Sequence, residues 1–273
     1  MRVLITGANS GFGLLTALTL ARDGHEVVAT MRDPGKGDGL RKVAEVEELP
    51  VEIRRLDVTD PASVEAAIDE PAALDAVVNN AGFEVQAAVE DLDDDLLARQ
   101  LDTNVRGPMR VIRRVLPVWR ERGHGVVVNV SSIAGVVASP YGGAYSASKF
   151  ALEALSEALH HEMRTFGIRV AIIEPGRFET GFHANIVSPP DWEASLHHPR
   201  AMRFRDSLEN LDGDGPPADP QLVADAVARA ITNPATPLRT LVGADAELIA
   251  GVRAQGSFED FELTMRTALN WFD

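Results

Sequence analysis

Cysteine is missing from this 273-residue chain, and basic residues are scarce. Without cysteine the chain can form no disulfide, no thiolate metal site and no cysteine nucleophile, which fits a reducing cytoplasm. Lysine and arginine together number 26 against 41 acidic residues, for a formal net charge of −15. Nucleic acids and anionic membranes attract basic surfaces, so we expect neither as a partner.

Long apolar runs are missing as well. No stretch reaches the roughly 18 apolar residues that suggest a membrane span. A strand-like run from Arg2 to Thr6 starts at the second residue and leaves no room for a removable presequence. We therefore expect a cytoplasmic protein.

No convincing set of metal ligands is present. Two histidine pairs, His160–His161 and His197–His198, are adjacent in sequence, and neighbouring residues on a helix point in different directions. The acidic run from Asp91 to Asp95 lacks the spacing of a calcium loop and suits a helix start. We predict no metal site.

The chain does have a regular alternation of strand-like and helix-like segments. The strand-like runs cover residues 3–6, 26–30, 51–56, 74–78, 126–130, 168–173 and 238–242. Helical spacing fills residues 93–121, with a break expected at Pro117, and residues 144–164. Such alternation predicts an α/β fold, a parallel sheet wrapped by helices. With no linker or repeat in sight, we expect one domain over residues 1–273.

Residues 178–217 depart from this regularity. They are rich in proline and contain Trp192 and Phe204. Long irregular insertions in compact domains are commonly lids or binding loops, so we predict a lid over the substrate. The tail from Ala244 reads as helical, and we expect packing or oligomer contacts from its late aromatic residues, which are Phe258, Phe261, Trp271 and Phe272.

Three glycines follow the first strand, at positions 7, 11 and 13. Glycines at a strand-to-helix turn allow a tight bend, close approach of a ligand to the backbone and close packing of the helix on the strand. The free N–H groups and dipole of the helix N-terminus then suit a phosphate.

Tyr145 and Lys149 stand four residues apart in the segment that reads as helix, on one face. A phenol with an ordinary pKa near ~10 exchanges protons poorly at neutral pH. A nearby cation favours the phenolate and lowers that pKa, so the pair is a candidate proton-transfer site.

From Arg2 to Thr180 the chain resembles the short-chain dehydrogenase/reductase family. The shared motifs, in the family's order, are Thr6-Gly7-x-x-x-Gly11-x-Gly13, Asp57-Val58, Asn79-Asn80-Ala81-Gly82, Asn104, Ser131-Ser132, Tyr145-x-x-x-Lys149 and Pro175-Gly176. Residues 29–34 are similar to 17β-hydroxysteroid and retinol dehydrogenase-like members. The resemblance implies a single NAD(P)-binding domain built on a Rossmann-type doubly wound parallel sheet of about seven strands, with helices on both faces.

The resemblance also implies the catalytic roles. Tyr145 would be the general acid in reduction and the general base in oxidation, with Lys149 lowering its pKa and holding the nicotinamide ribose. Ser132 would hydrogen-bond the substrate oxygen, and Ser131 is the less favoured alternative for this role. Asn104 would link Lys149 to a water chain, unless its side chain only bonds local backbone.

The cofactor-binding residues carried over from the family fall into groups. The phosphates would be surrounded by Gly7, Ser10, Gly11, Phe12 and Gly13. The adenine would contact Asp57 and Val58, unless Asp57 only closes its own turn, and the adenosine ribose would contact Asn80, Ala81 and Gly82. The nicotinamide amide and the phosphates would also contact Pro175, Gly176, Phe178 and Thr180. Arg177 has no role in this scheme.

The end of the second strand bears on the choice of cofactor. A carboxylate at position 31 would bind the 2′-hydroxyl of NAD, but Met31 stands there. Arg32 and Ser10 suit a 2′-phosphate, so we expect NADP(H) over NAD(H), although Asp33 nearby leaves an NAD-dependent alcohol dehydrogenase open.

The leading hypothesis is therefore a carbonyl reductase or alcohol dehydrogenase acting on a lipophilic small molecule, such as a ketone, aldehyde or alcohol. Its pocket would have Phe83, Val85, Val137, Trp192 and Phe204 as apolar walls. A non-catalytic redox sensor and a nucleotide-sugar epimerase or dehydratase are alternatives. The family often buries the Asn104 and Tyr145 helices between subunits, so we expect a homodimer or homotetramer.

Overall fold

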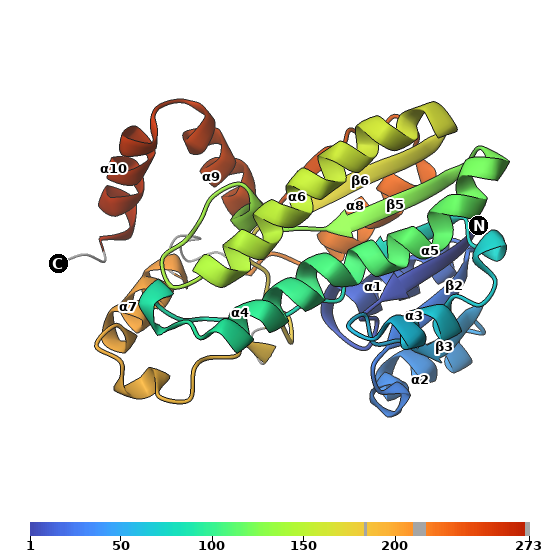
Figure 1. The fold of residues 1–273 in the computed structure, drawn as a ribbon, viewed down its shortest axis with the longest axis horizontal. Coiled ribbons are helices and arrows are strands. Elements are labelled where there is room, and N and C mark those ends of the chain that lie inside the picture. The colour runs from blue at the N-terminus through green and yellow to red at the C-terminus, as the bar shows by residue number, and fades with distance from the viewer. Residues whose placement is uncertain (183–184, 210–216, 271–273) are drawn as a thin grey trace.

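Seven strands form one parallel sheet at the centre of the protein (Figure 1). The computed structural model describes residues 1–182, 185–209 and 217–270. The strands are β1 (Arg2–Thr6), β2 (Glu26–Met31), β3 (Val51–Arg55), β4 (Ala76–Asn79), β5 (Gly125–Val130), β6 (Ile168–Pro175) and β7 (Arg239–Val242). Their order is β3-β2-β1-β4-β5-β6-β7, and every neighbouring pair is parallel. The predicted doubly wound parallel sheet is confirmed.

Two hydrophobic cores lie on opposite faces of this sheet. In β1, Val3 and Ile5 enter one core and Leu4 the other, because successive side chains of a strand point to opposite faces. The first core is covered by α1 (Gly11–Arg22), α2 (Asp38–Val46) and α8 (Gln221–Thr232), and the second by α3 (Pro61–Ala67), α5 (Gly107–Arg122) and α6 (Gly143–Met163). Burial on both faces explains the continuous apolar runs of the strands.

The helix expected over residues 93–121 is interrupted, but not at Pro117. It divides into α4 (Asp94–Leu101), a π-helical turn (Asp102–Arg106) and α5. Pro117 lies inside α5, so the predicted break is wrong. The helix continues past the proline because Trp119 is fully buried beyond it, with its indole N–H donating to the Leu74 carbonyl oxygen at 2.9 Å.

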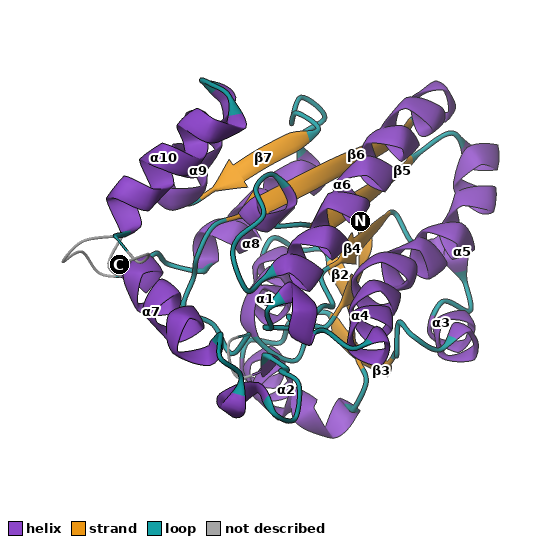
Figure 2. Cartoon of the chain, turned by 60° about the vertical axis from the view of Figure 1, so that its left-hand side comes forward, coloured by secondary structure: helices purple, strands orange, loops and turns teal. Residues whose placement is uncertain are grey.

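Three further helices gather beyond the carboxyl ends of the strands, at the left of Figure 1: α7 (His198–Glu209), α9 (Ala244–Ala254) and α10 (Phe258–Leu269). Figure 2 shows β7 at the edge of the sheet beside β6, with α9 and α10 next to it. The proline-rich segment thus contains α7 and a short 3₁₀ turn, Trp192–Ala194. None of the described helices is long and apolar enough to cross a membrane.

Candidate active site

The turn between β1 and α1 has a shape that favours glycine. Gly7 and Gly11 adopt φ angles of 69° and 54°, in the left-handed region. A Cβ on Gly13 would lie 2.4 Å from the Gly7 carbonyl oxygen, so α1 can approach β1 only with glycine there. Ser10 is the N-cap of α1, and its side chain caps no backbone N–H. The first turn of α1 therefore offers donors and a positive dipole end to an anion.

Asn80 ties this turn to the end of β4. Its side-chain amide donates to the carbonyl oxygens of Thr6 and Gly7 at 2.9 Å and 3.1 Å. The Thr6 hydroxyl in turn accepts the backbone N–H groups of Asn80 and Ala81, both at 3.0 Å. The two loops that are predicted to hold the cofactor are thus joined into one rigid unit.

The end of β2 places two cations at the cavity. Arg32 follows the buried Met31, and Lys36, which the sequence analysis missed, lines the same region. Asp33 uses its carboxylate within its own turn, where Oδ1 accepts the Gly35 N–H at 3.0 Å. Asp33 is the acid that kept NAD(H) open as an alternative cofactor, and its carboxylate has a structural role within its own turn.

Asp57 closes the turn after β3 and also lines the cavity. Its Oδ1 accepts the Thr59 N–H at 2.9 Å and the Thr59 hydroxyl at 2.7 Å. Burial raises the pKa of Asp57, but the Thr59 hydrogen bonds and the charges of Arg32 and Arg55 outweigh it, so the net pKa is lowered. The turn-closing alternative is observed, and it leaves an ionised carboxylate at the predicted adenine position.

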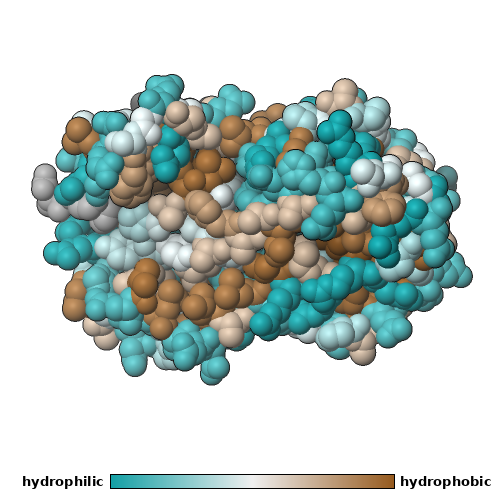
Figure 3. Space-filling view, turned by 45° about the horizontal axis from the view of Figure 1, so that its top comes forward, coloured by the Kyte–Doolittle hydropathy of each residue, from teal (hydrophilic) through white to brown (hydrophobic). Residues whose placement is uncertain are grey.

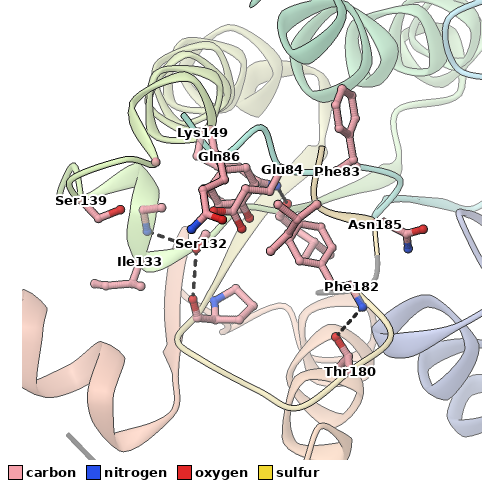
Figure 4. A pocket seen from close by; sticks show the side chains of 18 of the residues that line it. Phe83, Glu84, Gln86, Ser132, Ile133, Ser139, Lys149, Thr180, Phe182 and Asn185 are labelled. Atoms are coloured by element: carbon pink, nitrogen blue, oxygen red, sulfur yellow. Dashed lines mark hydrogen bonds between the residues drawn. The ribbon is translucent and has the colours of Figure 1, made fainter. Parts of the chain in front are cut away.

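Tyr145, Lys149 and Ser132 line another part of the same cavity. Lys149 Nζ lies 5.5 Å from the centre of the Tyr145 ring and donates to the Val130 carbonyl oxygen at 2.8 Å. The Ser132 hydroxyl is close enough to the Tyr145 phenol to lower the phenol pKa, and it also accepts the Ala134 N–H at 3.1 Å. The neighbouring Ser131 hydroxyl is buried, without a hydrogen-bond partner among the described residues. The geometry favours Ser132 over Ser131. Figure 4 shows Ser132 and Lys149 on the same side of the pocket.

The pKa values of the tyrosine and lysine move in opposite directions. Burial lowers the pKa of Lys149 to about 8, against the opposing charge of Glu153. Burial raises the pKa of Tyr145, the carboxylate of Glu84 raises it further, and the Ser132 hydrogen bond only partly offsets them. The net pKa of Tyr145 is therefore raised rather than lowered, because desolvation of the phenolate is the largest effect. That Lys149 stabilises the phenolate stays a prediction.

Asn104 lies in the π-helical turn between α4 and α5, almost fully buried. Its Nδ2 donates to the Phe83 carbonyl oxygen at 3.0 Å and to the Ser148 hydroxyl at 3.1 Å, and its Oδ1 accepts the Phe83 N–H at 3.2 Å. A Cβ on Gly82 would lie 3.2 Å from that Oδ1. The side chain thus bonds local backbone, as the alternative interpretation expected. Its link to Lys149 through water stays a prediction.

The loop after β6 is clamped by α9. Asp245 Oδ2 accepts the Arg177 N–H at 2.7 Å. A Cβ on Gly176 would stand 2.0 Å from Asp245 Oδ1, so only glycine permits this contact. Arg177, which had no role in the sequence scheme, therefore anchors the loop through its main chain.

Phe178 and Thr180 bring the same loop back to the glycine turn. The Phe178 ring is buried and meets Phe12 edge-on, with 5.5 Å between ring centroids. The Thr180 Cβ lies 3.6 Å from the position of a Cβ on Gly11. The two motifs, more than 160 residues apart in sequence, thus face each other across the candidate phosphate site.

One cavity of about 1640 Å³ joins these parts. It extends from the glycine turn past Tyr145 to the C-terminal helices, and all but two of the predicted site residues line it. The exceptions, Gly13 and Asn104, lie behind its wall and support it through packing and hydrogen bonds. Among the described residues no histidine and carboxylate side chains are grouped to hold a metal ion.

Three of the five predicted apolar walls line the cavity: Phe83, Val137 and Phe204. Val85 is wrongly predicted, because it is fully buried against Leu96 and Ala144. Trp192 is wrongly predicted too, because it packs in a separate cluster with Ala88 and Ala201.

The C-terminal tail also differs from expectation. Phe258 and Phe261 of α10 line the cavity, although they were assigned to packing or oligomer contacts, while Trp271 and Phe272 lie outside the described residues. Sequence reasoning missed the polar lining residues Glu84 and Gln86 as well. Their available signal was an acid and an amide set in an apolar stretch directly after Gly82.

Residues 1–191 match the family model described as "short chain dehydrogenase". The chain is 35% identical over 246 residues to a 3-ketodihydrosphingosine reductase of Bacteroides thetaiotaomicron, covering 88% of this chain and 87% of that protein. It is 33% identical over 249 residues to human retinol dehydrogenase 8, covering 87% of this chain and 79% of that protein. It is 37% identical over 197 residues to human 17-beta-hydroxysteroid dehydrogenase type 1, covering 69% of this chain and 60% of that protein.

Solved structures show the same architecture. A short-chain dehydrogenase from Streptomyces avermitilis superposes with a TM-score of 0.81 at 33% identity, covering 97% of this chain and 98% of that one. A gluconate 5-dehydrogenase from Burkholderia cenocepacia, solved in complex with NADP and tartrate, has a TM-score of 0.73 at 25% identity, covering 90% and 95%.

Proposed function

Because this chain belongs to the short-chain dehydrogenase family, we propose that it is an NADP(H)-dependent oxidoreductase that interconverts a carbonyl with a primary or secondary alcohol. The observation that carries this proposal is one continuous cavity. At one end it has the glycine turn and the N-terminus of α1, and at the other it has Ser132, Tyr145 and Lys149. A dinucleotide spanning these ends would bring its reactive ring beside a proton donor.

The residues at the cavity fit such a cofactor. The glycine turn allows backbone approach, as the crowding at Gly13 and the positive φ of Gly7 and Gly11 indicate. When bound, the dinucleotide supplies or accepts the hydride. The protein's own residues then position the substrate and move one proton.

Tyr145 would give its phenol proton to the carbonyl oxygen in reduction and take it back in oxidation. Ser132 would donate a hydrogen bond to the same oxygen and stabilise the charge that develops there. The raised pKa of Tyr145 keeps the phenol protonated, and therefore able to donate, at neutral pH. The Lys149 ammonium, with its pKa of about 8, is largely charged at pH 7 and would stabilise the phenolate left behind.

NADP(H) is favoured by the charges at the end of β2. Arg32 and Lys36 line the cavity, and the Asp33 carboxylate is engaged in its turn. The NADP in the Burkholderia gluconate 5-dehydrogenase structure is consistent with this preference, at the level of the family.

The substrate that we propose is a lipophilic small molecule. Phe83, Val137 and Phe204 supply apolar walls, and α7, α9 and α10 extend the cavity beyond Tyr145. Relatives named for 3-ketodihydrosphingosine, retinol and a 17-beta-hydroxysteroid are consistent with a substrate of this kind. The lid role of residues 178–217 and the cytoplasmic location stay predictions.

A panel of aliphatic, aromatic and steroidal carbonyl compounds tests the proposal, with NADPH and NADH oxidation followed by absorbance. We expect turnover of at least one lipophilic carbonyl. Tyr145→Phe should bind NADPH like the wild type and lose turnover by about a hundredfold or more, since it removes the general acid.

Tyr141→Phe is the matched control, because Tyr141 is the other tyrosine of the chain and lies outside the proposed proton transfer. Unchanged turnover in Tyr145→Phe would remove Tyr145 from the mechanism. NADPH binding without turnover of any carbonyl would instead support a redox sensor.

A further inference from the structure

Glu84 stands on a loop whose backbone is fixed on both sides. The Glu84 carbonyl oxygen accepts the Val187 N–H at 2.9 Å. The next residue, Val85, donates its N–H to Gln100 Oε1 at 2.6 Å. Phe83, on the other side, is held by Asn104. The direction of the Glu84 side chain is therefore set by a rigid support rather than by a flexible loop.

The Glu84 side chain lines the cavity at the start of the Tyr145 helix. Its Oε1 lies 4.0 Å from the position that a Cβ on Gly142 would take, and Gly142 is the N-cap of α6. Figure 4 shows Glu84 and Gln86 near Ser132 and Lys149. A carboxylate thus faces the place where a carbonyl would react.

No hydrogen bond or ion pair joins the Glu84 carboxylate to another described residue. Burial raises the pKa of Glu84, and the charge of Arg205 of α7 lowers it by less. The half-buried Glu84 carboxylate thus faces the cavity with no donor from the described residues, and a ligand in the cavity can supply one.

We propose that Glu84 is a specificity residue that binds a hydrogen-bond donor, best a primary ammonium, near the reacting carbonyl of the substrate. This inference rests on the proposed function and names the substrate class of the same cavity. The preferred substrates are lipophilic amino ketones or amino alcohols, with hydroxy ketones as weaker members of the class. An ammonium and a hydroxyl can both donate a charge-assisted hydrogen bond to a carboxylate, and the ammonium adds the attraction between opposite charges, which sets this order.

The same contact would assist the chemistry. The negative charge of Glu84 opposes formation of the Tyr145 phenolate, so a neutral ketone reacts against that charge. A substrate ammonium beside Glu84 would neutralise it and make the phenolate easier to form. The advantage should therefore be visible in kcat as well as in KM.

The test compares ketones of equal size that carry an ammonium, a hydroxyl or a methyl group on the first or second carbon from the carbonyl, with a hexyl chain on the other side. With NADPH, we expect the wild type to have a kcat/KM about tenfold or more higher for an ammonium compound than for its methyl counterpart. Glu84→Gln should reduce this preference to about twofold or less, because the ammonium compound loses its partner whereas the methyl ketone loses only a charge that opposed the Tyr145 phenolate.

Glu65→Gln is the matched control, because Glu65 is an exposed acid on α3 that does not line the cavity. Circular dichroism and NADPH binding check that Glu84→Gln is folded. Equal kcat/KM for ammonium and methyl ketones in the wild type overturns the inference. An equal loss of kcat/KM for the ammonium and the methyl ketone in Glu84→Gln also overturns it. That result would mean that Glu84 acts structurally, by holding Arg205 and α7 in place.

A binding measurement separates this inference from the proposed function. Calorimetry with heptylamine and heptanol, on the NADPH-loaded wild type and Glu84→Gln, needs no turnover. Tighter binding of the amine that Glu84→Gln abolishes supports Glu84 as the cation site, even if no carbonyl in the panel is reduced. Equal binding of both probes to both proteins contradicts it, even if carbonyls are reduced.

Discussion

At the scale of the residue, the predicted preference for NADP(H) rests on the residues that follow β2. Met31 is buried in the core, so the position where an NAD-specific acid would stand has no polar group to offer. Arg32 at the cavity has a guanidinium that can bind a phosphate through two parallel hydrogen bonds. The carboxylate of Asp33 bonds its own turn instead.

Replacing Arg32 tests this reasoning. Arg32→Ala should lower kcat/KM with NADPH by about tenfold or more and leave kcat/KM with NADH nearly unchanged, since only NADPH carries the 2′-phosphate. Arg41→Ala is the control, because Arg41 pairs with Asp38 and lies outside the cavity. Wild-type enzyme that uses NADH tenfold more efficiently than NADPH would show the assignment to be wrong.

At the scale of the element, three segments near the site share a buried charged cluster. Arg239 of β7 lies 3.0 Å from the Glu153 carboxylate of α6 and 3.7 Å from the Glu174 carboxylate of β6. Burial and the adjacent Glu153 raise the pKa of Glu174 to about 7, although Arg239 opposes this. Because the single cation Arg239 faces two buried carboxylates, the folded state favours the protonated form of Glu174.

The pH dependence of stability follows from that raised pKa. In the folded state Glu174 keeps its proton up to about pH 7, whereas in the unfolded chain it loses it near 4.5. The stabilisation that comes from protonated Glu174 in the folded state is therefore fully present below about pH 4.5 and is lost as the pH rises through 7. Glu174→Gln should be more stable than wild type by about 1–3 kcal/mol at pH 8, because it never ionises, and should differ little near pH 5.

Thermal unfolding of the two proteins at these pH values measures the effect. Glu162→Gln, an exposed acid on the same helix as Glu153, should follow the wild type at every pH. A Glu174→Gln advantage that is as large at pH 5 as at pH 8 would contradict the proposed ionisation.

At the scale of the whole molecule, several large apolar side chains are exposed on the surface. On the face shown in Figure 3, apolar residues form a band across the middle with hydrophilic residues along its margins. On α6, the helix that carries Tyr145, Phe150 and Leu155 are 44% and 40% exposed. The predicted burial of the Tyr145 helix between subunits would cover both side chains, and contiguous exposed apolar surface marks such contacts.

Light scattering checks the predicted homodimer or homotetramer. We expect Phe150→Asp to shift the protein toward smaller species, because a buried charge in the contact would be unpaired. Val46→Asp, on the 84% exposed Val46 of α2, is the control and should leave the assembly unchanged. A wild-type monomer at micromolar concentration would refute the oligomer.

The alternation of elements was predictable because it follows from local patterns. Runs such as Val126 to Val130 are apolar at every position except Asn129, as expected for a strand that is buried on both faces of a sheet. The glycine turn and the Tyr145–Lys149 spacing were equally local. What the periodicity could not show is where a helix is interrupted, since Pro117 is accommodated by the tertiary contacts of Trp119 and the π-helical turn falls at Asn104.

The amino-acid order by itself determined the parallel sheet, the family and the residues at the two ends of the cavity, because each depends on spacing along a single strand, turn or helix. Only the tertiary structure decided which side chains surround the substrate. Glu84, Asp245 and α10 reach the cavity from segments far apart in the chain, and Val85 and Trp192 turn away from it. It also decided the direction of the Tyr145 pKa, since desolvation and the charge of Glu84 arise from packing and leave no signature in the Tyr–Lys spacing.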